Sequence, residues 1–338
     1  MATLASNVLT LNDWAKRQDP KGKTAVIVEM LSQTNEILTD MMFKEGNLPT
    51  GERTTIRTGL PTAYYRKMNM GTPKSKSTTV QVTENAAQLT ARSEVDVDVA
   101  ALESDVNGFR LSESEPFMEA MAQTQAQTLC YGTNANAEEY EGFIPRYNDL
   151  SAANAQNILD AGGTGSDNAS ILLVGWGAKS CFGVFPKGSK AGLTHMNKGI
   201  IEVDDDNGEP FDAYVDTYKW NNGLVVKDWR YACRIANIDI SDLLAQTGTQ
   251  APAAATALVK LMSRSIDRLP NLTGTSNAFY VNRSVASLLR VAALDKSSSV
   301  VTVESGLNQF GKDIYTMRFL GIPIRITDAL LNTEARVV

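Results

Sequence analysis

The side chains best suited to chemistry are few in this sequence, and they are widely spaced. His195 is the only histidine, which disfavours histidine-activated nucleophiles and the common zinc sites. The three cysteines, Cys130, Cys181 and Cys233, have no Cys or His at ligand spacing. Their odd number and wide separation are typical of small buried thiols in a reducing compartment, and argue against a disulfide framework or a metal site.

Two short segments could bind ligands. Gly162–Asp167 (GGTGSD) superficially resembles a phosphate loop, but it lacks the Gly-Lys-Ser/Thr ending and the strand-before, helix-after context. Asp204–Glu209 (DDDNGE) is the densest carboxylate group and could hold a hard cation. The Asn207-Gly208 pair between predicted strands favours a hairpin turn there. We predict no catalytic residue, cofactor or metal site, and a metal-dependent enzyme using residues 204–209 is the weaker alternative.

Composition and charge narrow the class of protein. The 338 residues have the apolar and charged fractions of an ordinary globular protein and a net charge of −6. Residues 1–77 hold 11 Lys/Arg and 7 Asp/Glu, whereas the remainder holds 21 and 31. An acidic body argues against sequence-specific recognition of nucleic acid. Without a recognisable signal peptide or an apolar run of about 18 residues, the chain is expected to be soluble and to stay where it is made.

The elements that come first in the chain have apolar faces but no local partner. A short helix is predicted at residues 13–17, and a helical stripe of Ile27, Met30 and Met41 ends at Glu45–Gly51. Residues 53–58 and 74–99 then alternate like two lean strands, in which Val80 and Val82 share a face and Asp96 and Asp98 form a solvated one. An isolated two-stranded ribbon is marginal in water.

A long helix and an α+β region follow. Ser112–Glu115 forms a capping box, Pro116 falls in the first turn, and the apolar spacing predicts a helix over residues 112–131. Strands are predicted at 171–176, 200–203, 213–215, 224–238, 300–303, 314–319 and 322–326, and helices at 253–269 and 284–294.

The arm and the ribbon bury too little apolar surface by themselves. At about 25 cal/mol per Å², such elements offset their ordering entropy only by lying across another molecule. This pattern is typical of a subunit that wraps around its neighbours. The residues expected to make these contacts between subunits are Trp14, Ile27, Met30, Ile56, Lys74, Lys76, Val80 and Val82.

Several segments carry a resemblance to a known family. They are Leu9–Arg17, Val28–Asn35, Glu45–Gly51, Ser93–Asp98 and Phe185–Gly192, together with the order of arm, ribbon, long helix and terminal Gly321–Arg325 strand. In these the sequence resembles the Hong Kong-97-type major capsid proteins of tailed bacteriophages, and in particular those of the epsilon-fifteen-like short-tailed phages. The likeness covers essentially the whole chain.

The resemblance implies an α+β capsid fold with five parts. These are an N-terminal arm (1–52), an E-loop (53–95), a P-domain (96–149) with its spine helix (112–131), an A-domain (150–310) and C-terminal strands returning to the P-domain (311–338). The E-loop would extend over an adjacent subunit. Lys67, Lys74 and Lys76 lie in that loop, but no acceptor asparagine or assisting glutamate is identifiable, so no covalent cross-link is predicted.

The resemblance also implies the function and the partners. Copies of the chain would form the pentamers and hexamers of an icosahedral shell around double-stranded DNA, assembled in the bacterial cytoplasm and carried in the virion. A separate scaffolding protein, a portal protein and an optional decoration protein would be partners, DNA would be approached without sequence preference, and no membrane would be involved. An encapsulin-like shell that encloses a protein cargo is the close alternative.

Overall fold

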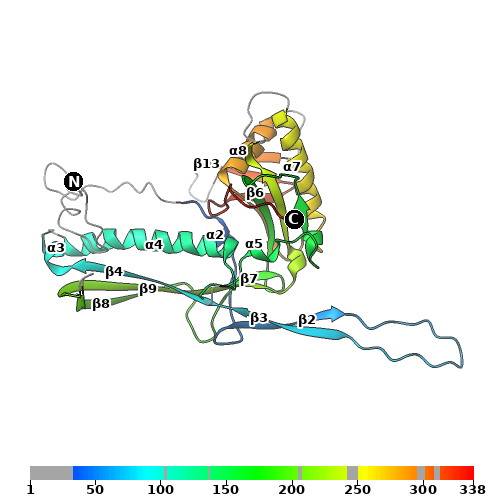
Figure 1. The fold of residues 1–338 in the computed structure, drawn as a ribbon, viewed down its shortest axis with the longest axis horizontal. Helices are drawn as coiled ribbons and strands as arrows, with labels where there is room; N and C mark the ends of the chain where they lie inside the picture. Colours follow the sequence, from blue (N-terminus) through cyan, green and yellow to red (C-terminus); the bar gives the residue numbers. More distant parts are fainter. Residues whose placement is uncertain are drawn as a thin grey trace.

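The computed structural model describes residues 33–102, 105–135, 138–204, 208–241, 250–294, 301–307 and 313–338. Figure 1 shows an elongated molecule, in which a long helix and long strands lie along the horizontal axis, an upright sheet with helices stands on them, and a hairpin projects at one end. The predicted helix at 13–17 and the contact candidates Trp14, Ile27 and Met30 lie outside the described residues.

The upright part contains a mixed sheet. Its strands run in the order β12 (Val301–Leu307), β13 (Asp313–Phe319), β14 (Ile322–Ile326), β11 (Ser276–Val281) and β6 (Asn168–Trp176), and β6 also pairs with β10 (Ala232–Asp239), which pairs with β5 (Ile158–Asp160). Every residue of β6 is buried. A strand buried on both faces reads as a continuous apolar run, which is why residues 171–176 predicted it.

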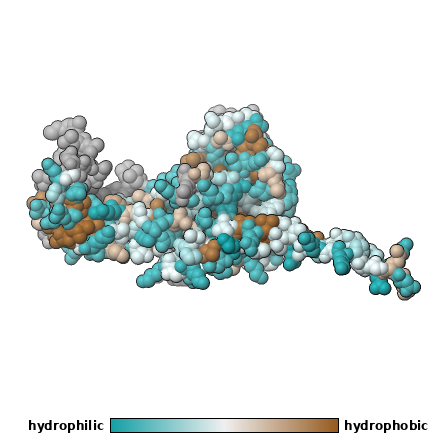
Figure 2. Space-filling model, turned by 60° about the horizontal axis from the view of Figure 1, so that its bottom comes forward, coloured by the Kyte–Doolittle hydropathy of each residue, from teal (hydrophilic) through white to brown (hydrophobic). Residues whose placement is uncertain are grey.

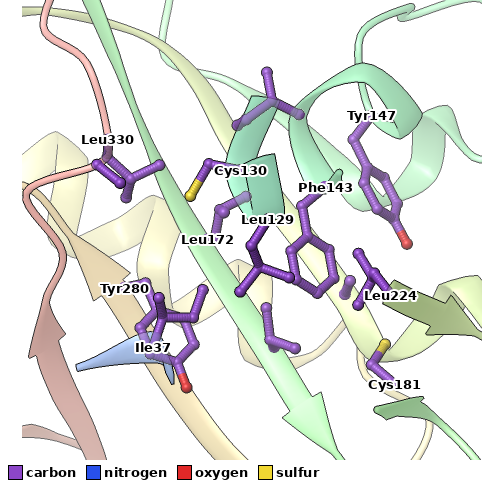
Figure 3. Packing of buried hydrophobic residues seen from close by; sticks show 14 of the residues in the cluster. Ile37, Leu129, Cys130, Phe143, Tyr147, Leu172, Cys181, Leu224, Tyr280 and Leu330 are labelled. Atoms are coloured by element: carbon purple, nitrogen blue, oxygen red, sulfur yellow. The ribbon is translucent and has the colours of Figure 1, made fainter. Parts of the chain in front are cut away.

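The two faces of β6 belong to two hydrophobic cores. Ile171 and Leu173 pack with helices α7 (Gln250–Ile266) and α8 (Arg283–Leu294) on one face. Leu172 and Val174 face the opposite core, which contains Leu129 and other residues from the end of the long helix (Figure 3). The second core is completed by the short helix α5 (Phe143–Arg146) and by residues near both ends of the described chain.

The strand β9 (Pro210–Val226) joins the upright part to the elongated base. Its last residues pair with β7 (Cys181–Phe185). Its earlier residues pair with β8 (Leu193–Asp204) on one side, within Pro210–Trp220, and with β4 (Ala87–Asp96) on the other, over Ala213–Asn222. The pairing of β8 with β9 confirms the hairpin predicted around residues 204–209. The turn η2 (Trp229–Tyr231) separates β9 from β10, so the single strand predicted at 224–238 is two strands.

The long helix α4 (Val106–Tyr131) lies along this three-stranded sheet (Figure 1). It begins six residues before the predicted start at Ser112. The Asp105 side chain accepts a hydrogen bond from the Gly108 amide and caps the helix, whereas the Ser112 hydroxyl donates to the Phe109 carbonyl. The capping box at Ser112 was therefore a wrong prediction, and Pro116 lies inside the helix.

The ribbon is shorter than predicted. The strands β2 (Gly51–Gly59) and β3 (Thr78–Asn85) pair only with each other, and β4 leaves the ribbon to join β9. Val95 is buried against Phe109, and residues 97–101 form the short helix α3 (Val97–Ala101), which Asp96 caps. The predicted solvated strand face of Asp96 and Asp98 is wrong because the chain turns into a helix there.

The described part of the arm packs against its own chain. Helix α2 (Ile37–Asp40) covers only the end of the predicted helical stripe, and β1 (Phe43–Glu45) follows and pairs with β7. Ile37 and Met41 are buried in the core of the same chain. The expectation that the leading hundred residues lie on other copies is therefore wrong for residues 33–46 and 87–101. Among the described residues it remains a prediction only for the hairpin, and residues 1–32 lie outside the described part.

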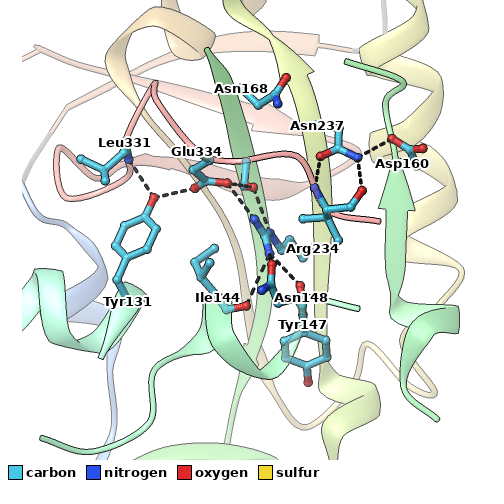
Figure 4. Close-up of polar contacts among 12 residues, drawn as sticks. Tyr131, Ile144, Tyr147, Asn148, Asp160, Asn168, Arg234, Asn237, Leu331 and Glu334 are labelled. Atoms are coloured by element: carbon cyan, nitrogen blue, oxygen red, sulfur yellow. Dashed lines mark hydrogen bonds and ion pairs between the residues drawn. The ribbon is translucent and has the colours of Figure 1, made fainter. Parts of the chain in front are cut away.

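The C-terminal strands differ from the prediction too. Strands β13 and β14 belong to the upright sheet, where β14 pairs with β11, and do not return to the base. Only the segment after Ile326 reaches the long helix. There the Tyr131 hydroxyl donates to Glu334 and accepts from the Leu331 amide (Figure 4).

Glu334 lies at the centre of a buried network. It bonds Arg234, 2.8 Å away, and the Ser170 hydroxyl, while Arg234 also donates to the Tyr147 carbonyl at 2.7 Å. The network joins the C-terminal segment to the upright sheet and to α5 (Figure 4). In the described part of the chain, no helix is both long and apolar enough to cross a membrane.

Candidate assembly surfaces

The hairpin β2–β3 presents an apolar side that its own chain covers only in part. In the register, Ile56 lies opposite Val80 and Thr54 lies opposite Val82, and paired residues point to the same face. Val80 is half exposed, and Ile56 and Val82 are partly exposed. Thr79 and Gln81 lie on the opposite face. The predicted contact residues Ile56, Val80 and Val82 are thus brought together on one side of the hairpin.

The tip of the hairpin, residues 60–77, combines exposed apolar side chains with positive charge. Leu60 is 81 % exposed and Met68 93 %, and Tyr65 is fully exposed. The tip contains Arg66, Lys67, Lys74 and Lys76 and no acidic residue. Figure 1 shows it at the end of the molecule farthest from α3. Exposure of so many large apolar groups on a projection marks an interaction surface.

The root of the hairpin carries two buried carboxylates that face each other. Glu52 of β2 lies directly opposite Glu84 of β3. Each has its own cation: Lys227 lies 2.9 Å from Glu52, and Arg146 binds Glu84 through both terminal nitrogens at 2.7 Å. Burial opposes the charge of Arg146, but the hydrogen bonds with Glu84 raise its pKa above the usual value. We call these four residues the root cluster.

The opposite end of the molecule is apolar and acidic. Val95, Phe109 and Tyr214 pack together and hold α3, the start of α4 and the β8–β9 sheet in one unit. On its surface Leu102, Leu111 and Ile200 are more than half exposed. Figure 2 shows the hydrophobic patch at this end. The exposed carboxylates of this acidic end include those of Asp98, Asp105, Glu202, Asp204, Glu209 and Asp212.

Two of these carboxylates lie opposite each other. Glu202 of β8 pairs directly with Asp212 of β9, and both are exposed. Like charges at directly opposed positions destabilise a sheet. A cationic group that approached them from another molecule would therefore be bound favourably.

The single histidine is part of an ion-pair network next to this end. His195 Nε2 lies 2.8 Å from Asp216, its ring stacks on Tyr218, and Arg110 of α4 lies 2.7 Å from the other Asp216 oxygen. Burial opposes the negative charge of Asp216, and the hydrogen bonds from Arg110 and His195 lower its pKa. The network joins β8 and β9 to the helix, and His195 is a half-exposed residue of strand β8.

The other residues whose side chains could take part in chemistry are the cysteines and the carboxylates. Cys130, Cys181 and Cys233 are buried, as predicted, and burial raises the pKa of each thiol to about 12. Among the described residues, no group of three or more His, Cys, Asp or Glu could hold a metal ion. The carboxylate cluster 204–209 includes residues 205–207, which lie outside the described part.

The comparisons with known proteins bear on these surfaces. Residues 19–338 match the family described as major capsid protein GP7. The chain belongs to this family. A comparison with curated proteins found no match.

A solved structure agrees with the family. The capsid protein is similar to a chain in the structure of bacteriophage Epsilon15, with 30 % sequence identity and a TM-score of 0.76, covering 100 % of this chain and 99 % of that one. A chain of the bacteriophage JBD30 capsid (11 % identity, TM-score 0.45) covers 89 % of this chain and 92 % of its own. A chain of the SrpI encapsulin complex from Synechococcus elongatus (11 % identity, TM-score 0.44) covers 71 % and 99 %.

The capsid protein therefore has the Hong Kong-97-type fold, and the main functional prediction is confirmed: it is a structural protein of a phage capsid. Sequence reasoning missed the root cluster. The signal for it was Glu52 and Glu84, the acidic residues that flank a stretch from Arg53 to Thr83 with none. Their cations come from Arg146 and Lys227, which lie far away in the sequence.

Proposed function

We propose that the capsid protein forms the pentamers and hexamers of an icosahedral shell that encloses double-stranded DNA. The observation that carries this is the hairpin, whose strands pair only with each other, whose Val80 is half exposed, and whose tip bears strongly exposed apolar side chains. Covering this surface requires another molecule, and in a shell the molecule next to each copy is another copy. The protein has a structural role and no enzymatic one.

The acidic end is the proposed partner of the tip. The tip is apolar and positively charged, the acidic end is apolar and negatively charged, and the two lie at opposite ends of the long axis (Figure 1). Surfaces that complement each other from different ends of a molecule make heterologous contacts, which generate closed rings of copies when the rotation closes. Lys74 and Lys76 would approach Glu202 and Asp212.

The division into arm, E-loop, P-domain and A-domain is part of the proposal, with boundaries shifted to suit the structure. The hairpin from Gly51 to Asn85 is the E-loop, and β4, β8, the first part of β9 and α4 make up the P-domain. The upright sheet with α7 and α8 is the A-domain. Trp14, Ile27 and Met30 stay proposed contact residues of the arm.

Further partners follow from the class of shell. A separate scaffolding protein would guide assembly in the bacterial cytoplasm, a portal protein would occupy one vertex, and a decoration protein is an optional partner. Packaged DNA would lie near the inner surface without sequence-specific contacts. A cargo-filled compartment is the second candidate, and a portal or terminase gene beside the capsid gene would decide against it.

The experiment places a charge on the apolar side of the hairpin. Val80→Asp should leave the subunit folded, because Val80 is half exposed and lies outside both cores, yet it should prevent or strongly reduce shell formation. Thr79→Asp, on the opposite face of the same strand, is the matched control and should assemble. Circular dichroism would follow folding, and negative-stain electron microscopy would follow assembly. Shells of normal yield from Val80→Asp would contradict the proposal.

A further inference from the structure

The root of the hairpin holds two buried, opposed carboxylates, which repel each other and have no counter-ion of their own in strands β2 and β3. Glu52 and Glu84 are directly opposed and are only 6 % and 7 % exposed. Opposed like charges repel, and a buried carboxylate without a counter-ion is strongly unfavourable. Each glutamate is tolerated there only while a cation from elsewhere in the fold remains beside it.

Those cations come from two separate elements of the body. Arg146 belongs to α5, and its guanidinium is also fixed on the other side, where it donates to the Glu141 carbonyl at 3.1 and 3.3 Å. Lys227 follows β9, and the second oxygen of Glu52 accepts from the Asn47 amide at 2.8 Å. The bidentate Arg146–Glu84 pair allows little rotation, and the Lys227 and Asn47 contacts hold Glu52 on the adjacent strand, so the two attachments together define a direction.

The backbone at the root has little freedom as well. Gly51 has a φ of +148°, and a Cβ built there would lie 2.0 Å from the Glu84 carbonyl oxygen. The Asn47 side chain accepts from the Arg53 amide and donates to its carbonyl. Beyond the root, the described hydrogen bonds of the hairpin run between its own two strands, as between Thr58 and Thr78.

We propose that the root cluster sets the direction of the hairpin before copies meet, so that Glu52, Glu84, Arg146 and Lys227 are positioning residues for the contact between copies. This rests on the proposed function of the hairpin. A nine-residue strand is about 30 Å long, so a rotation of roughly 10° at the root moves its far end by about 5 Å. A hairpin held in its docking direction loses less entropy on binding.

The test measures the direction of the hairpin in unassembled full-length subunits. Spin labels on Thr72→Cys in the tip and Lys179→Cys in the body, both exposed positions, report a distance distribution by pulsed dipolar spectroscopy. The three native thiols are buried and will not be labelled in the folded protein. We expect one narrow distribution for the wild-type root.

Two variants remove one whole pair each: Glu52→Gln with Lys227→Met, and Glu84→Gln with Arg146→Met. We expect the distribution to broaden at least twofold and the concentration needed for assembly to rise several-fold. Arg92→Met with Glu94→Gln removes a partly exposed pair within β4, away from the root, and should change neither. If a double variant loses its near-UV dichroism, Glu52→Gln alone, which keeps the shape of the side chain, takes its place.

A broad distribution in the wild type, or an unchanged narrow one in the root variants, would overturn the inference. Because the distances are measured before assembly, the result does not depend on whether a shell forms. Failure of the wild type to assemble would contradict the proposed function instead, and the distance data would still decide the role of the root cluster.

Discussion

At the scale of single residues, a buried ion pair joins the upright sheet to the C-terminal segment. Arg234 is 1 % exposed and Glu334 6 %, and the guanidinium also donates to the Tyr147 carbonyl and the Ser170 hydroxyl. Removing one member leaves the other as an uncompensated buried charge, which is far more costly than the loss of an exposed pair.

Arg234→Met should therefore lower the free energy of unfolding by about 3–5 kcal/mol. Arg230→Met, which breaks the pair between exposed Arg230 and partly exposed Asp228, should cost less than about 1 kcal/mol. Urea unfolding of unassembled subunits measures both. Equal losses in the two variants would show that Glu334 does not depend on Arg234.

Buried thiols and phenols make stability depend on alkaline pH. The folded protein raises the pKa of Cys130, Cys181 and Cys233 from 9.0 to about 12, chiefly by burial, and burial raises the pKa of Tyr140 and Tyr280 as well. Above about pH 9 the unfolded chain ionises these groups while the folded one does not, so proton release favours unfolding.

The melting temperature should accordingly gain nothing from these groups on going from pH 7 to 8, and should fall steadily from about pH 9 to 11. Differential scanning calorimetry in matched buffers would follow it. Cys233→Ala should show a shallower decline than the wild type, whatever its starting stability. A melting temperature that stayed level up to pH 11 would refute this reasoning.

At the scale of elements, sequence patterns predicted the helices and strands whose formation depends on neighbouring residues. The apolar run of β6 and the amphipathic spacing of α7 and α8 identified those elements in sequence. The start of α4 could not be predicted in this way, because Asn107 and Gly108 are weak helix formers. That first turn is held by contacts with distant residues, Phe109 against Val95 and Tyr214, and Arg110 with Asp216.

The difference between local patterns and distant contacts also explains which parts of the candidate surfaces could be predicted. The apolar side of the hairpin was visible in the alternation around Val80. The point at which the ribbon ends could not be predicted, because β4 pairs with β9, which lies more than a hundred residues later in the chain. The arm was misjudged likewise, since the partners of Ile37 lie in parts of the core that the first fifty residues do not contain.

Truncation separates the two parts of the arm. Removing residues 1–32 takes away none of the described core contacts, so the subunit should keep its secondary structure and its melting temperature within a few degrees. Removing residues 1–45 also deletes Ile37, Met41 and β1, and should destabilise the subunit by several kcal/mol. Circular dichroism melts of both truncations would test this. Indistinguishable melts would mean that residues 33–45 contribute little to the core.

At the scale of the whole molecule, the two ends differ in charge, and each lies too far from the other to pair within one chain (Figure 1). The attraction between exposed charges weakens as salt rises. Charge complementarity of this kind chiefly sets the rate of encounter and the choice of partner, while apolar contact supplies the affinity.

A charge exchange tests this pairing of ends. Lys74→Glu with Lys76→Glu should slow assembly at low salt by tenfold or more, and Glu202→Lys with Asp212→Lys should do the same. Combining all four substitutions restores opposite signs and should recover much of the rate. Light scattering gives the rates, and electron microscopy checks the products. A combined variant as slow as either parent would place the tip against another surface.

Glu334 is synthesised a hundred residues after its partner Arg234, and this order has a consequence for biosynthesis. Until Glu334 has left the ribosome, Arg234 lacks its counter-ion and Tyr131 its acceptor. A nascent polypeptide cannot complete its core before that point, and one that is terminated ahead of Glu334 never can. Only translation products that contain Glu334 then reach the state in which they can be built into a particle.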